Sequence, residues 1–73
     1  MTREELIEQI EDILMIDIGT LDLDKPLSEY EDWDSMAHLS VFSLFDSSLQ
    51  IKITTKSIRE FKTARDILAK ANL

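Results

Sequence analysis

The 73-residue sequence predicts an all-α fold, a small four-helix bundle with one short helix. Apolar residues recur every three to four positions in several segments, as they do along one face of a helix. Threonine, serine or aspartate precedes each of these segments, where a helix needs a cap. The one alternating stretch, residues 51–53, is too short to find a partner in a sheet. This length supports one hydrophobic core, so we expect residues 1–73 to form a single domain.

Residues 2–16 are predicted to form the first helix. Thr2 and Glu5 have the spacing of a capping box, in which each side chain bonds the other residue's backbone N–H. The apolar positions share one arc of the helix: Leu6, Ile7, Ile10, Ile13 and Leu14. The acidic positions lie on the opposite arc and are expected to be exposed: Glu4, Glu5, Glu8, Glu11 and Asp12.

Residues 17–34 are predicted to form a long loop, because they contain Gly19, Pro26 and seven acidic residues with no sustained period. Loops of this length are usually functional or held by buried side chains. The expected anchors in the core are the apolar residues Leu21, Leu23, Leu27 and Tyr30.

A second helix is predicted over residues 35–49, capped by Asp34 or Ser35. Met36 and Leu39 fall outside its apolar face, so both are expected to be exposed. Serines line the opposite side at Ser40, Ser43 and Ser47. The broad apolar face consists of Val41, Phe42, Leu44, Phe45 and Leu49.

The C-terminal third is predicted to contain a short helix and a final helix. Residues 51–53 are a connector that buries one of its two isoleucines. Thr55 caps a short helix that ends near Phe61, and Thr63 with Asp66 caps the last helix. The buried stripe of this last helix is Ala64, Ile67, Leu68 and Ala71.

The net charge of −7 is divided unevenly along the chain. Residues 1–34 hold twelve acidic and two basic residues, whereas residues 35–73 hold three and six. This balance argues against nucleic-acid binding. It fits either a solvated acidic face or a surface that steers positively charged partners. There is no apolar run long enough to span a membrane and no pattern of a signal peptide, so a cytoplasmic location is expected.

Catalysis and metal binding have weak signals in this sequence. His38 follows Ser35 by three residues and could touch it on a helix, but no third group or oxyanion hole is evident for a serine hydrolase. Asp17, Asp22 and Asp24 miss the ligand spacing of a calcium-binding hand. The chain has no cysteine for a thiolate metal site. We therefore expect no dedicated metal site and no enzymatic activity.

Residues 31–39 place Ser35 at the first turn of a helix, after a long acidic loop. Ser35 is either simply the helix cap or the attachment point of a phosphate ester. A helix N-terminus offers free backbone N–H groups and a positive dipole end, which stabilise an anion by about 0.3–1 kcal/mol. Composition does not choose between these two interpretations.

The chain resembles the acyl carrier proteins over essentially its whole length. Asp34-Ser35-Met36 is similar to the family's Asp-Ser-Leu motif, and the helix order, long loop and acidic charge agree. The resemblance implies a 4′-phosphopantetheine arm on Ser35, transferred from coenzyme A by a phosphopantetheinyl transferase that recognises Asp34. It also implies that Met36 and Val41 belong to the apolar contact and pocket region of the second helix. Leu39, expected to be exposed near Ser35, is a further candidate for partner binding.

The implied function is to carry acyl groups as thioesters between partner enzymes of fatty acid, polyketide or other specialised acyl biosynthesis. These partners would be acyl-activating, condensing or acyltransferase enzymes, and carriers of this kind usually act as monomers. Ser40, Ser43 and Ser47 stand where family members of fatty acid synthesis usually have acidic residues, and only Asp46 is charged. We therefore expect a specialised stand-alone carrier.

Three phenyl rings, at Phe42, Phe45 and Phe61, are expected to narrow the acyl pocket and to favour short or unusual chains. Two other functions remain open. One is an aminoacyl or peptidyl carrier of non-ribosomal synthesis, which shares the fold and the arm. The other is an interaction module that keeps the carrier fold without modification of Ser35.

Overall fold

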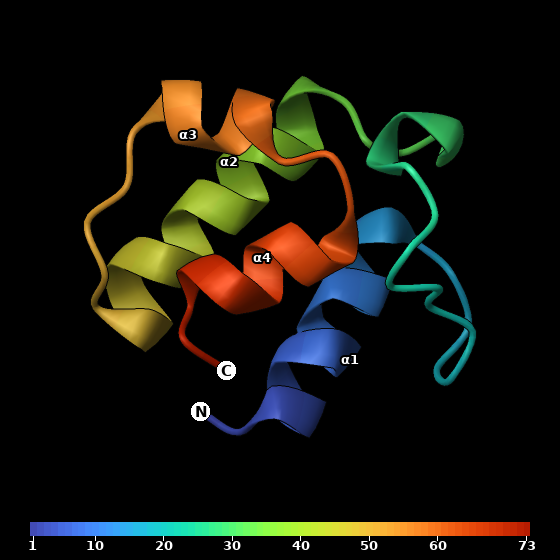
Figure 1. The fold of residues 1–73 in the computed structure, drawn as a ribbon, viewed down its shortest axis with the longest axis horizontal. Coiled ribbons are helices and arrows are strands. Elements are labelled where there is room, and N and C mark those ends of the chain that lie inside the picture. The colour runs from blue at the N-terminus through green and yellow to red at the C-terminus, as the bar shows by residue number, and fades with distance from the viewer.

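The computed structural model describes all 73 residues as a mostly helical domain with four α-helices and no β-strand, which confirms the predicted class at this level. Helix α2 packs against α1 and α3, and α1 packs against α4 (Figure 1). No helix combines the length and the apolar character needed to cross a bilayer. The elements in chain order are α1 (Arg3–Leu14), a 3-10 turn η1 (Leu27–Glu29), α2 (Ser35–Ser43), a π-helical segment η2 (Leu44–Leu49), α3 (Thr55–Glu60) and α4 (Ala64–Lys70).

The core is one cluster of 13 buried residues to which every α-helix and the long loop contribute. Phe45 is the largest of its fully buried side chains. The four residues predicted to form the stripe of the last helix are all in this cluster. Its members are Leu6, Ile10, Leu14, Leu27, Tyr30, Val41, Leu44, Phe45, Ile58, Ala64, Ile67, Leu68 and Ala71.

The predicted capping box starts α1. The Thr2 hydroxyl accepts a hydrogen bond from the Glu5 N–H at 3.1 Å, and the Glu5 carboxylate accepts one from the Thr2 N–H at 2.9 Å. The hydrogen bond from the Thr2 N–H, and then the Thr2 hydroxyl beside the carboxylate, lower the pKa of Glu5 from its ordinary value of 4.5. The helix ends at Leu14, two residues before the predicted end, because Met15 adopts a left-handed conformation with a φ of 57°.

Glu11 corrects the prediction that all acidic residues of α1 are exposed. Its side chain is 1% exposed. One carboxylate oxygen, Oε2, accepts hydrogen bonds from the backbone N–H groups of Gly19 at 2.8 Å and Leu21 at 3.1 Å. The long loop therefore returns over this side of α1 and covers the carboxylate, which a helical period alone does not predict.

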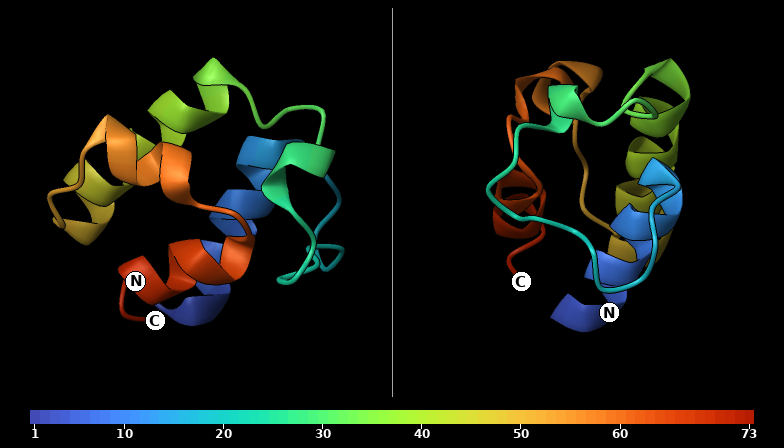
Figure 2. Two further views of the ribbon diagram at one scale, coloured as in Figure 1. Left: turned by 45° about the horizontal axis from the view of Figure 1, so that its top comes forward. Right: turned by 90° about the vertical axis from the view of Figure 1, so that its right-hand side faces the viewer.

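The long loop runs across one end of the molecule between α1 and α2 (Figure 2). Leu27 and Tyr30 are buried, whereas Leu21 and Leu23 are half-buried against the core, so all four predicted anchors contact it. The Leu27 N–H donates a hydrogen bond of 2.8 Å to the Lys62 carbonyl, which ties η1 to the segment between α3 and α4.

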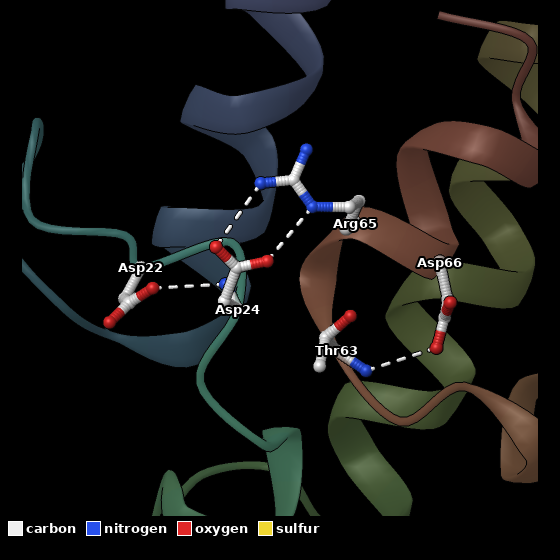
Figure 3. A network of polar contacts seen from close by, with 5 residues as sticks. All are labelled: Asp22, Asp24, Thr63, Arg65 and Asp66. Carbon is white, nitrogen blue, oxygen red and sulfur yellow. Dashed lines mark hydrogen bonds and ion pairs between the residues drawn. The ribbon is translucent and has the colours of Figure 1, made fainter.

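An ion pair joins the same loop to α4 (Figure 3). The Arg65 guanidinium donates to the Asp24 carboxylate at 2.9 and 3.3 Å, and the Asp22 carboxylate accepts from the Asp24 N–H at 2.9 Å. The hydrogen bonds and the positive charge of Arg65 hold the pKa of Asp24 below its ordinary value of 3.8. Nearby, Asp66 accepts from the Thr63 N–H at 3.2 Å, so the predicted pairing at the start of α4 is present.

The second helix changes its hydrogen-bonding pattern before its predicted end. α-Helical bonds continue to Ser43, and residues 44–49 form a π-helical segment. At this junction the Ser47 hydroxyl donates to the Ser43 carbonyl at 2.8 Å, a type of side-chain bond that competes with the backbone ladder of a helix. The segment ends at Gln50, which has a left-handed φ of 54°.

The short helix α3 begins one residue earlier than predicted. Thr54, and not Thr55, is its cap, because the Thr54 hydroxyl accepts a hydrogen bond from the Ser57 N–H at 3.2 Å. In the connector before it, both isoleucines are half-buried, whereas the sequence predicted that one would be buried. The two chain ends lie side by side, and Arg3 donates to the Leu73 carbonyl at 2.8 Å (Figure 1).

Candidate functional site

Asp34 caps α2 and leaves the Ser35 hydroxyl free. The Asp34 oxygen Oδ1 accepts hydrogen bonds from the backbone N–H groups of Met36 and Ala37, both at 3.1 Å. Ser35 is the first residue of the helix and is exposed, and its hydroxyl forms no hydrogen bond with the rest of the chain. Of the two caps considered from the sequence, the structure selects Asp34, so the fold itself does not require the Ser35 hydroxyl.

This cap also changes the electrostatics at the start of α2. One of the two interpretations of Ser35 from the sequence is a phosphate ester stabilised by free N–H groups of the helix. A helix N-terminus has four backbone N–H groups without helical partners. In α2, two of these groups are already bonded to Asp34. The capping group is moreover a carboxylate, and a like charge opposes a second anion beside it. The helix N-terminus therefore offers less to an anion than the sequence predicts.

Ser35 lies at a small cavity between α2 and α3, of about 220 Å³. The cavity is smaller than a typical small-molecule pocket of roughly 300–1,000 Å³. Apolar and polar groups share its walls, with a hydroxyl, an imidazole and a guanidinium among the polar ones. The lining residues are Ser35, His38, Leu39, Phe42, Thr55, Ile58 and Arg59.

His38 is half-buried and stacks edge-on against Trp33, with 4.7 Å between the ring centroids. Its Nε2 atom is buried and has no hydrogen-bond partner. No hydrogen bond joins His38 to Ser35, although both line the same cavity. The arrangement thus lacks the contact between base and nucleophile that a serine hydrolase uses.

The three phenyl rings occupy different places. Phe42 was predicted on the apolar inner face, but it is 36% exposed and is the only one of the three rings that lines the cavity at Ser35. Phe45 is fully buried and packs against Phe61, with 6.3 Å between the ring centroids. Phe42 thus lies where α2 faces α3, a placement that the helical period does not encode.

The other predicted contact residues divide between surface and core. Met36 is 71% exposed and Leu39 is 61% exposed, as predicted from their positions outside the apolar face. They flank Ser35 on the first turns of α2 and form an apolar surface there. Val41 is 1% exposed and lies in the core, so it does not reach a partner directly.

A wider hollow of about 460 Å³ follows the outer side of α2, between this helix and α1. The serines that replace the expected acidic residues line it, so this side of α2 is polar and nearly uncharged. The lining residues are Gln9, Asp12, Ile13, Leu39, Ser40, Ser43, Leu44, Ser47 and Ser48.

Three residues of α3 line the cavity at Ser35 but were not predicted as site residues: Thr55, Ile58 and Arg59. Their spacing of three and four positions places them on one face of a helix, which is the only signal the sequence offers. Arg59 also lines a second cavity of about 530 Å³, with Trp33, Phe61 and Lys62 among its walls.

No group of three or more His, Asp or Glu side chains is arranged to hold a metal ion. Comparison of the chain with protein-family models, with curated proteins and with solved structures finds no match.

Proposed function

We propose that the chain is an acyl carrier protein, with a helical bundle of the carrier type and a 4′-phosphopantetheine arm on Ser35. One observation carries the proposal. The Ser35 hydroxyl is exposed and unbonded at the first turn of α2, because Asp34 caps the helix. A hydroxyl that the fold does not use, beside a cavity with apolar walls, is suited to be a point of attachment.

Attachment requires a transferase and coenzyme A as co-reactant. Ser35 Oγ attacks the phosphorus atom next to the pantetheine part of coenzyme A, and the Ser35 proton passes to a base of the transferase. The new P–Oγ bond forms as the phosphoanhydride bond breaks, and adenosine 3′,5′-bisphosphate leaves. The attached arm supplies a thiol that holds an acyl group as a thioester.

Partner enzymes would recognise the carrier by the surface around Ser35. Asp34 sits beside the hydroxyl, where a phosphopantetheinyl transferase can recognise it. Met36 and Leu39 offer exposed apolar contacts to acyl-activating, condensing or acyltransferase enzymes. Because serines line the outer side of α2, docking on this face depends less on charge than it would with a row of acidic residues.

The cavity at Ser35 supports the hypothesis of a short or unusual acyl cargo. Leu39, Phe42 and Ile58 provide apolar walls, but the volume of about 220 Å³ leaves little room for a long saturated chain. The ring of Phe42 fills part of this space. The carrier would therefore serve a specialised pathway.

Intact mass spectrometry tests the proposal. After incubation with coenzyme A and a broad-range phosphopantetheinyl transferase, the chain should gain the mass of one phosphopantetheinyl group. Ser35→Ala should gain nothing, whereas Ser40→Ala, a change at an exposed serine on the same helix, should gain as the unchanged protein does. An unmodified chain after this treatment would overturn the carrier function and favour an interaction module.

The identity of the activating enzyme separates the two carrier functions. Loading of the modified chain by acyl-activating enzymes, and not by amino-acid adenylating enzymes, is expected for an acyl carrier. Selective loading with an amino acid would assign the chain to non-ribosomal synthesis instead.

A further inference from the structure

Arg59 is an uncommitted cation at the cavity beside Ser35. It is the only arginine or lysine among the cavity's lining residues. The one ion pair in the structure joins Arg65 to Asp24, and no hydrogen bond engages the Arg59 guanidinium. The charge of Arg59 is therefore available to a ligand.

The start of α2 needs such a cation if an anion is attached to Ser35. Glu31, Asp32 and Asp34 immediately precede the serine and make this end of the loop strongly acidic. The carboxylate of Asp34 already occupies two N–H groups of the helix. A phosphodiester on Ser35 would thus meet negative charge on one side, and Arg59 on the opposite helix provides the compensating charge.

We propose that the cavity between α2 and α3 is a binding site for an oxyanion carried by the arm on Ser35, with Arg59 as its principal ligand. This inference rests on the proposed carrier function. The oxyanion comes from one of two sources, the phosphodiester at the root of the arm or a carboxylate at the far end of the acyl cargo. Both present two oxygen atoms in the geometry that a guanidinium binds with paired hydrogen bonds.

The other walls of the cavity strengthen this assignment. Leu39, Phe42 and Ile58 give the cavity apolar walls, and a charge interaction beside apolar groups is less screened than one in bulk solvent. The Thr55 hydroxyl adds a donor. The imidazole of His38 lines the same cavity and has a buried Nε2 without a partner.

NMR of the Arg59 side-chain Nε–Hε group tests the proposal in three states of the protein. If the phosphodiester is the ligand, the signal should shift when the arm is attached. If a cargo carboxylate is the ligand, the signal should shift on loading with a succinyl group but not with the butyryl group, which has the same length without the charge. No shift on attachment or on either loading would overturn the proposal.

Variants separate a specific site from general charge attraction. Binding of the oxyanion should also shift the amide signals of Thr55 and Ile58, which line the same cavity. Arg59→Gln should abolish these amide shifts, and Arg59→Lys should retain part of them. The matched control is Lys56→Ala, which removes an exposed cation from the same helix but not from the cavity. Equal loss of the shifts in the Lys56 and Arg59 variants would contradict a site built on Arg59.

A titration of the unmodified chain distinguishes failure of this inference from failure of the proposed function. Inorganic phosphate at constant ionic strength should give a saturable shift of the Arg59 signal, which Arg59→Gln removes. If no arm can be attached but this shift is present, the carrier function fails and the anion site remains. If the arm is attached but Arg59 responds to neither phosphate, nor the arm, nor a succinyl cargo, the carrier function remains and the anion site is refuted.

Discussion

The carboxylate oxygen Oε2 of Glu11 accepts a hydrogen bond of 2.8 Å from the backbone N–H of Gly19, eight residues further along the chain. The same oxygen accepts a second bond from Leu21. Gly19 has a φ of 86°, a conformation that glycine adopts without strain and that turns the chain back toward α1. One buried carboxylate thereby fixes the beginning of the loop that leads to Ser35.

Replacement of Glu11 by Ala should destabilise the fold and loosen this loop. Two backbone N–H groups would lose a charged acceptor, and a hydrogen bond to a charged group contributes about 1.5–3 kcal/mol when buried and less at these half-buried amides. The free energy of unfolding from urea titration and the hydrogen-exchange protection of the Gly19 and Leu21 amides should both fall. Glu8→Ala, at an exposed position of the same helix, is the control, and equal effects of the two substitutions would contradict the role of Glu11.

This bond also illustrates what the sequence could and could not predict. Helix positions and caps depend on near neighbours, so the Thr2–Glu5 and Thr63–Asp66 pairs and most of the buried stripe were predictable from spacing. Glu11 sits at a position that the helical period assigns to solvent. Its burial depends on a loop eight residues away, and the residues around it give no local signal of that contact.

The candidate site likewise combines a residue that was predictable from the sequence with one whose role depends on tertiary packing. Ser35 lies in the first turn of α2, as its position after the acidic loop predicts, whereas the sequence left open whether its hydroxyl caps the helix. The participation of Arg59 depends on how α3 packs against α2, a contact between two separate helices that local spacing does not encode. The change to π-helical bonding after Ser43 coincides with a bond from the Ser47 hydroxyl to the Ser43 carbonyl, which a search for apolar periodicity does not weigh.

Asp34→Ser should separate helix capping from recognition by the transferase. Serine is nearly as good a cap as aspartate, so the stability should change by less than about 0.5 kcal/mol, whereas Asp34→Ala should cost about 1 kcal/mol. The rate of attachment of the arm should nevertheless fall in both variants, because the carboxylate is lost. Denaturant titrations and the rate of mass gain measure the two effects. Attachment to Asp34→Ser at the unchanged rate would assign Asp34 to capping alone.

The Asp24–Arg65 ion pair should contribute to the pH dependence of the free energy of unfolding. Because the hydrogen bond and charge of Arg65 lower the pKa of Asp24 in the folded state, the pair stabilises the protein above the ordinary pKa of 3.8. This contribution disappears as the pH falls through the lowered pKa. Both side chains are largely exposed, so the effect should be small and weaken with salt.

An NMR titration of the Asp24 carboxyl carbon measures this pKa directly. Arg65→Gln should raise it toward 3.8, whereas Lys70→Gln, which removes another cation of the C-terminal segment, should leave it unchanged. A pKa of Asp24 that does not respond to the Arg65 substitution would refute the ion pair.

Phe42→Ala should enlarge the cavity at Ser35 and admit longer acyl chains. Phe42 is partly exposed, so its loss should cost less stability than Phe45→Ala, for which about 3–5 kcal/mol is expected from the fully buried ring. In the modified protein, the methyl signals of Leu39 and Ile58 should respond to an octanoyl group more strongly in Phe42→Ala than in the unchanged chain. An equally strong response in the unchanged chain would contradict the proposed limit on chain length.

The attachment point itself is tested most directly by peptide mapping. The chain is produced together with a broad-range phosphopantetheinyl transferase, digested with a protease, and its peptides are fragmented in the mass spectrometer. The account predicts that, of the seven serines, Ser35 alone carries the phosphopantetheinyl group. A bare Ser35, or the group on any other serine, would contradict it.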